Sequence, residues 1–160
     1  MRRVTAIVLI VMTSVVLVSS ALAESATKEE CIAKCKEAAQ LINEKGQEAA
    51  LQEINKKGSN FVWKDTYVFI VDFNGTFLAQ PSRPDHIGKN YLEWKTSDGK
   101  YPQKMSIEVA KTKGEGWVEY VQAKPEELKK PPAERILSKK STYIYRVPGK
   151  EMYCGAGIYE

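Results

Sequence analysis

The chain has 160 residues, which is enough for one ordinary domain with one buried core and too few for two comfortable ones. It has 24 Lys and Arg residues against 20 Asp and Glu, a formal charge of +4, and no run of basic residues longer than two. This mild charge excludes the strongly basic surface that nucleic-acid binding requires, so no nucleic-acid partner is expected.

Residues 1–23 have the pattern of a secretory signal peptide. Two arginines precede an apolar run of about 15 residues, and Ala21-Leu22-Ala23 supplies the small residues of a cleavage site. The apolar run is shorter than the roughly 20 residues of a membrane-spanning helix, although retention as a membrane anchor is the alternative. The sequence therefore predicts a mature domain, residues 24–160, that is periplasmic or secreted and has no transmembrane segment after cleavage.

The first third of this domain is predicted to be helical. Thr27-Lys28-Glu29-Glu30 fits a capping box at the start of a helix, and apolar residues then recur at spacings of three and four up to Gly46. A second helix is expected over 47–57, ending at Gly58.

After Gly58 the pattern changes to that of β-strands. Residues 66–71 are β-branched and aromatic, Asp72-Phe73-Asn74-Gly75 supplies a turn, and 76–79 continue the apolar pattern as a hairpin. Both faces of the first strand are apolar, so it is expected to lie in the centre of a sheet with both faces covered.

The remaining elements are predicted to be short helices and strands. They are a polar connection at 80–90, a helical turn at 91–94, a short helix at 102–113, strands at 117–123, 141–147 and 152–159, and a Pro- and Lys-rich excursion at 124–137. No regular crossover helix separates two strands, which disfavours a parallel sheet. The fold class is therefore α+β, with helices packed on an antiparallel sheet of about five strands.

Nothing in the sequence indicates catalysis, a metal or a cofactor. His86 is the only histidine and is expected to be exposed in a loop, and no nucleophile elbow or zinc-binding helix is present. Asp72 could begin a calcium loop, but Arg83 then occupies the twelfth position, where Glu is required. The protein is therefore not expected to be an enzyme.

Three cysteines leave two alternatives open. Cys31 and Cys35 share one face of the first helix, and either could form a disulfide with Cys154 in an oxidising compartment. Alternatively, all three are small buried apolar residues.

Aromatic and polar residues alternate along the predicted strands. The pairs that share a strand face are Tyr67 with Phe69, Tyr120 with Gln122, and Tyr143 with Tyr145. Tyrosines of this kind suit a small pocket for a polar ligand, although the strand spacing by itself favours residues of a core.

A set of motifs in a fixed order extends over almost the whole mature chain. They are Phe61-Val62-Trp63-Lys64-Asp65-Thr66-Tyr67-Val68-Phe69-Ile70-Val71-Asp72, Gly75, Leu78-Ala79-Gln80-Pro81, Ile87-Gly88-Lys89-Asn90, Gly114-Glu115-Gly116-Trp117-Val118-Glu119-Tyr120, Lys124-Pro125 and Tyr153-Cys154-Gly155-Ala156-Gly157-Ile158-Tyr159. In their order and spacing they resemble the single Cache domain family, the extracellular sensor domains of bacterial chemoreceptors and kinases.

The resemblance implies a PAS-like core, in which a long N-terminal helix packs on one face of the sheet and a pocket for a small organic molecule, often a short carboxylate, lies on the other. The positions that match the family's pocket are Tyr67, Phe69, Gln80, Pro81, Tyr120, Gln122, Lys140 and Tyr143. Lys140 would offer a positive charge to a carboxylate. The chain has Gln80 where the family usually has His, and Gln122 where Trp is common.

The sequence thus favours an exported small-molecule-binding sensor domain that acts with a membrane receptor or kinase. The alternative function is a cysteine-based redox or structural interaction protein of the periplasm.

Overall fold

The computed structural model describes residues 24–160. The predicted signal peptide and its cleavage site up to Ala23 lie outside the described residues. Within residues 24–160, no helix is long and apolar enough to cross a membrane.

The long N-terminal helix begins where its sequence signals predict. In α1 (Lys28–Lys45), the Thr27 hydroxyl accepts a hydrogen bond from the Glu30 amide at 3.2 Å, and the Glu30 carboxylate accepts one from the Thr27 amide at 2.9 Å. These bonds satisfy amide donors that have no partner within the helix. α2 (Gln47–Asn55) follows after Gly46 and ends two residues before its predicted limit.

Five strands form one antiparallel sheet, which confirms the predicted α+β architecture. The sheet contains β3 (Phe69–Asp72), β4 (Phe77–Ala79), β5 (Glu115–Ala123), β6 (Leu137–Arg146) and β7 (Met152–Tyr159), in the order β4-β3-β7-β6-β5. A separate small hairpin joins β1 (Val62–Trp63) and β2 (Thr66–Tyr67). The remaining elements are α3 (Pro102–Thr112) and the short 3-10 helices η1 (Pro84–His86), η2 (Pro125–Lys129) and η3 (Pro132–Glu134).

Strand β6 begins earlier than its apolar pattern predicts. Residues 137–140 pair with 120–123 of β5, so the strand starts at Leu137 instead of Ser141. The pairing brings Lys140 into the sheet directly opposite Tyr120.

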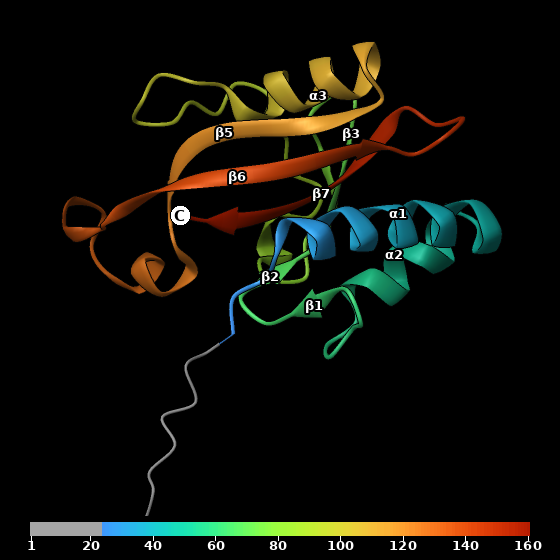
Figure 1. The fold of residues 1–160 in the computed structure, drawn as a ribbon, viewed down its shortest axis with the longest axis horizontal. Helices are drawn as coiled ribbons and strands as arrows, with labels where there is room; N and C mark the ends of the chain where they lie inside the picture. Colours follow the sequence, from blue (N-terminus) through green and yellow to red (C-terminus); the bar gives the residue numbers. More distant parts are fainter. Residues whose placement is uncertain (1–23) are drawn as a thin grey trace, which may run out of the picture.

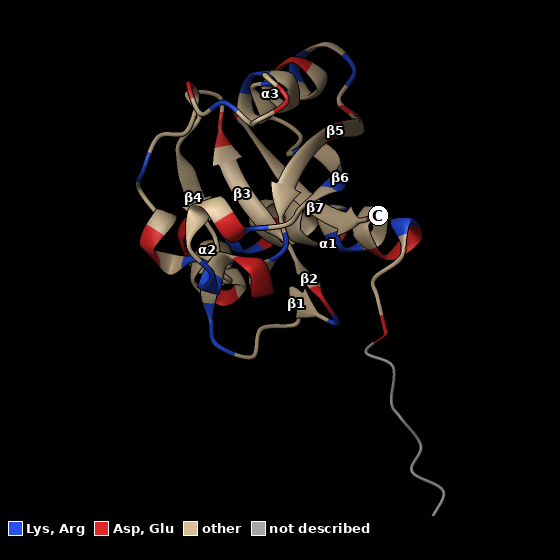
Figure 2. Ribbon diagram, turned by 90° about the vertical axis from the view of Figure 1, so that its left-hand side faces the viewer, with Lys and Arg blue, Asp and Glu red and all other residues tan. Residues whose placement is uncertain are grey.

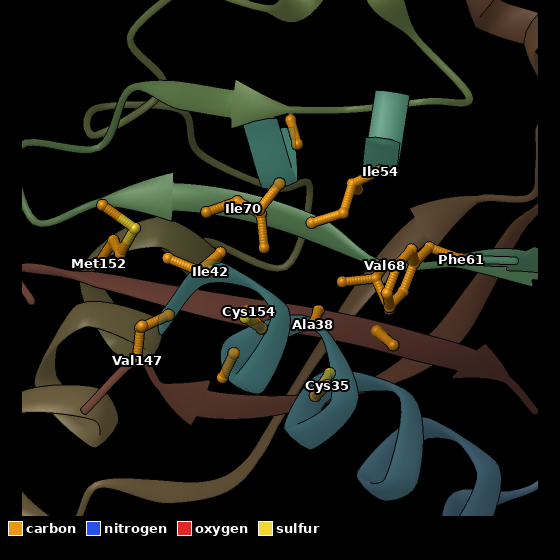
Figure 3. Packing of buried hydrophobic residues seen from close by; sticks show 14 of the residues in the cluster. Cys35, Ala38, Ile42, Ile54, Phe61, Val68, Ile70, Val147, Met152 and Cys154 are labelled. Carbon is orange, nitrogen blue, oxygen red and sulfur yellow. The ribbon is translucent and has the colours of Figure 1, made fainter. Parts of the chain in front are cut away.

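Helices cover both faces of the sheet (Figure 1), because alternate residues of each strand carry apolar side chains to opposite sides. On the α1 face, Val68 and Ile70 pack with Ile42 and Cys154 (Figure 3). On the α3 face, a second cluster is built around Phe69 and its neighbours. As predicted, β3 lies inside the sheet, between β4 and β7. The predicted strand over 66–71 is divided, however, because residues 66–67 form β2 of the separate hairpin and β3 begins at Phe69.

Charged residues lie mainly on the helices and connections, whereas the strands of the sheet carry few (Figure 2). Lys140 departs from this pattern, since it is a lysine in β6 with only 6% of its surface exposed.

Candidate functional site

A cavity of about 930 Å³ lies over the same face of the sheet as α3. All five strands of the sheet, together with Tyr67 of β2, contribute side chains to its lining. The connection from β4 to α3 and the excursion from β5 to β6 contribute the rest. A cavity of this size and composition is typical of a small-molecule site.

Six of the eight residues that the sequence placed in a pocket line this cavity. They are Tyr67, Phe69, Gln80, Tyr120, Gln122 and Lys140. These residues come from four strands and the segment that follows β4, so only the folded sheet brings them together.

Tyr143 is a correction, because it lies on the opposite face of the sheet. Its ring packs against Trp117 at 5.3 Å between centroids, within the core beneath α1, and its hydroxyl donates to the Glu115 carboxylate. Lys140 and Tyr143 are three residues apart on one strand, and residues at odd spacings point to opposite faces. They cannot both line the same cavity.

Pro81 is also a correction. Its neighbours Gln80 and Ser82 belong to the lining, but Pro81 does not. The backbone N–H of Gln80 donates to Asn55 Oδ1 at 2.9 Å, which fixes the backbone at this point. The side chains of Gln80 and Pro81 then point in different directions, because they are successive residues of an extended chain.

Lys140 is a buried cation without a counter-charge. Among residues 24–160 its ammonium forms no ion pair, and the contacts it makes are a 3.5 Å hydrogen bond to Gln122 Oε1 and a 4.8 Å approach to the ring of Tyr159. Burial lowers its pKa to about 8. Such a group is costly to keep charged, and an anion placed beside it would offset that cost.

Gly157 provides the space that Lys140 occupies. A Cβ atom at residue 157 would lie 2.7 Å from Lys140 Cε and 2.7 Å from Thr142 Oγ1. Any larger residue at this position would displace the lysine side chain.

The other charges in the lining are positive as well. Arg83, Lys95, Lys129 and Arg135 line the cavity, and no Asp or Glu is among its described lining residues. The Arg83 guanidinium is already paired with Asp85 through two 3.2 Å hydrogen bonds. The cavity therefore favours an anion, with Lys140 as its most deeply buried charge.

Two tyrosines and an amide give the lining a set of polar tips. The Tyr120 hydroxyl is 3.1 Å from Thr142 Oγ1, and the Tyr67 hydroxyl accepts a 3.4 Å hydrogen bond from Gln80 Nε2. Gln80 Oε1 is buried and accepts no hydrogen bond from any residue in 24–160. Buried polar atoms normally have a partner, so this oxygen is a candidate acceptor for a donor group in the cavity.

Sequence reasoning missed the aromatic residues that the β4–α3 connection brings to the site. His86 was expected to be an exposed loop residue, but its side chain is only 18% exposed and its ring stacks on Tyr91 at 4.7 Å. Both rings line the cavity together with Trp94. The connection has no repeating pattern, so only its content of aromatic residues could have pointed to the site.

The three cysteines are free thiols in the structure, and the disulfide with Cys154 is not formed. All three have no exposed surface, and Cys35 and Cys154 lie in the core cluster between α1 and the sheet (Figure 3). Burial raises the pKa of Cys31 to about 12 and raises the pKa values of Cys35 and Cys154. These thiols have the character of small apolar core residues.

Comparison with known proteins gives a consistent result. A family model described as a Cache domain matches residues 13–160. No curated protein matches the chain.

Solved structures with the same fold come from sensor proteins. A Cache chemosensory domain, described with the structural basis of its carboxylic acid recognition, has a TM-score of 0.65 and 21% identity over 82% of this chain and 91% of its own. A methyl-accepting chemotaxis protein from Vibrio parahaemolyticus has a TM-score of 0.63 and 20% identity over 82% of this chain and 87% of its own. A periplasmic sensor domain of a chemotaxis protein has a TM-score of 0.58 and 16% identity over 82% and 88%. At these low sequence identities, the similarity shows that the proteins share a fold and nothing more.

Proposed function

The chain belongs to the Cache domain family, and we propose that it is an extracytoplasmic sensor domain that binds a small organic carboxylate and carries out no catalysis. The observation that carries this proposal is the buried ammonium of Lys140, which lines the cavity without a carboxylate partner among residues 24–160.

Electrostatics support an anionic ligand. Two opposite unit charges about 4 Å apart attract by about 4 kcal/mol at the effective dielectric constant of a protein surface, against about 1 kcal/mol in water. A carboxylate beside Lys140 would gain this attraction and would raise the pKa of the lysine. The exposed cations of the lining would also raise the rate at which anions enter.

The proposed location outside the cytoplasm is supported by the sequence of residues 1–23, which has the order of regions found in a signal peptide. The proposed partner is a membrane receptor or kinase that responds to the ligand-bound domain. The chemotaxis proteins with the same fold support this assignment.

The test is calorimetric titration of the purified protein with acetate, propionate, pyruvate, lactate and larger carboxylates, each beside its neutral amide where one exists. We expect carboxylates to bind and their amides to bind at least tenfold more weakly. Lys140→Gln should weaken carboxylate binding by at least tenfold.

Lys139→Gln is the matched control. It removes the same charge from the neighbouring residue, whose ammonium pairs with Glu119 and Glu160 and is not part of the cavity lining. The proposal fails if no carboxylate binds to the folded protein, or if Lys140→Gln and Lys139→Gln have the same effect.

The structure gives no support to the redox alternative. A redox-active cysteine needs an accessible thiolate, and Cys31, Cys35 and Cys154 are buried thiols with raised pKa values.

A further inference from the structure

We propose that the carboxylate bound in this cavity carries a flat aromatic body, which stacks on Trp94 while its charged end meets Lys140. This inference rests on the proposed function, because it takes a carboxylate at Lys140 as its starting point. It adds the chemical class of the ligand, an aryl-substituted carboxylic acid.

The size of the cavity is the first argument. A water molecule occupies about 30 Å³ in the liquid, so the four non-hydrogen atoms of acetate need roughly 100 Å³. The cavity holds about 930 Å³. A two- or three-carbon acid would fill a small part of this space and would leave most of the apolar lining in contact with water.

Exposed apolar surface inside the cavity is the second argument. Five large hydrophobic residues of the described chain are exposed, and two of them, Trp94 at 37% and Leu137 at 48%, line the cavity. They come from different segments, the β4–α3 connection and the start of β6. Apolar surface gathered in a concave site is typical of ligand binding.

Trp94 is held in place for such a role. Its amide donates to the Tyr91 carbonyl at 3.0 Å, and the turn that follows is closed by the Thr96 amide donating to the Lys100 carbonyl at 2.9 Å. Trp94 and Tyr120 meet edge to face, with ring centroids 6.4 Å apart and planes at 88°. Trp94 still has 37% of its surface exposed, so its ring is not fully covered by the protein.

Tyr120 connects the aromatic surface to the charge. It is paired directly with Lys140 in the register of β5 and β6, so their Cβ atoms lie about 5 Å apart. Trp94 contacts the ring of the same tyrosine. One ligand of the size of an arylacetate can therefore lie beside both groups.

The experiment is calorimetric titration of the purified protein with four probes that differ in one feature each: acetate, phenylacetate, cyclohexylacetate and phenylacetamide. We expect phenylacetate to bind at least tenfold more tightly than acetate, because each well-placed apolar group in a pocket contributes a factor of about ten or more. Cyclohexylacetate, which is apolar but not flat, should bind more weakly than phenylacetate.

Variants of Trp94 test the stacking directly. Trp94→Ala should bring the ratio of phenylacetate to acetate affinity close to one, and Trp94→Phe should retain part of it. Ile87→Ala is the matched control, since Ile87 lies in the same connection with 39% exposure but is not part of the lining, and this variant should retain the full ratio. Circular dichroism of each variant confirms that it is folded.

The outcomes separate the two proposals. If acetate binds as tightly as phenylacetate, or cyclohexylacetate binds as tightly, the aryl inference is wrong and the carboxylate function stands. If phenylacetamide binds as tightly as phenylacetate, the carboxylate function is wrong. If none of the four probes binds, the aryl inference is wrong, and the titrations with propionate, pyruvate and lactate decide the carboxylate function.

Discussion

Lys140 connects the cavity to the stability of the protein. Its pKa is about 8 in the folded state against an ordinary value of 10.5, because burial penalises the charged form. Between these two values the unfolded chain binds more protons than the folded one, so the free energy of unfolding rises with pH across this window. Below about pH 8 the folded state carries a cost of about 3 kcal/mol from this one residue.

We therefore expect Lys140→Met to be more stable than the unmodified protein at pH 7, by up to about 3 kcal/mol, and this difference to be largely lost near pH 10. Urea denaturation of both proteins at the two pH values measures it. Lys139→Met is the control and should change stability by less than about 1 kcal/mol, because its ion pairs are exposed. If the stability difference between Lys140→Met and the unmodified protein does not depend on pH, the pKa of Lys140 is not lowered in the folded state.

At the scale of elements, α1 depends on its N-terminal cap. The reciprocal hydrogen bonds of Thr27 and Glu30 hold the first turn, and Lys64 of the β1–β2 hairpin adds a 2.7 Å ion pair to Glu30. The helix that begins there supplies Cys31 and Cys35 to the core, so fraying of its start would expose buried surface.

Thr27→Ala should lower the free energy of unfolding by about 1 kcal/mol and increase hydrogen exchange in the first turn of α1. Ser25→Ala, two residues earlier and outside the helix, should have no measurable effect. Equal stabilities for the two variants would show that the cap contributes little.

At the scale of the whole molecule, the cysteines test whether the two ends of the chain are covalently joined. Because Cys31, Cys35 and Cys154 are free and have no exposed surface, a thiol reagent should find none in the native protein within minutes. It should find three per chain after unfolding in guanidinium chloride without reductant. A count of one thiol in the unfolded protein would establish the disulfide alternative instead.

Most of the fold could be predicted from the sequence because its signals are local. The capping box at Thr27 marks the start of α1, the run of β-branched and aromatic residues marks β3, and β7 has the predicted bounds of 152–159. The alternation of side chains along a strand would also have excluded Tyr143 from the cavity lining. Tyr143 is three residues from Lys140, and this odd spacing places the two side chains on opposite faces of the sheet.

The rest of the site could not be predicted, because it is built by irregular chain. His86, Tyr91 and Trp94 lie in a connection without periodicity, and their positions depend on backbone hydrogen bonds to distant residues, such as Tyr91 N to Gly75 O at 2.9 Å. The sequence also does not indicate that Gln80 Oε1 is buried without a hydrogen-bond donor among the described residues, because this depends on how the side chain packs.

The place of β7 in the sheet has a consequence for how the chain folds. This strand lies in the middle of the sheet, between β3 and β6, yet it is the last element of the described residues in chain order. Phe69 of β3, for example, pairs with Gly155 of β7, which lies 86 residues later in the chain. Pairing of strands that are far apart in the sequence is slow. During synthesis, the edges of β3 and β6 that pair with β7 have no partner until residues 152–159 have been made. The five-stranded sheet therefore cannot be completed until residues 152–159 have been synthesised.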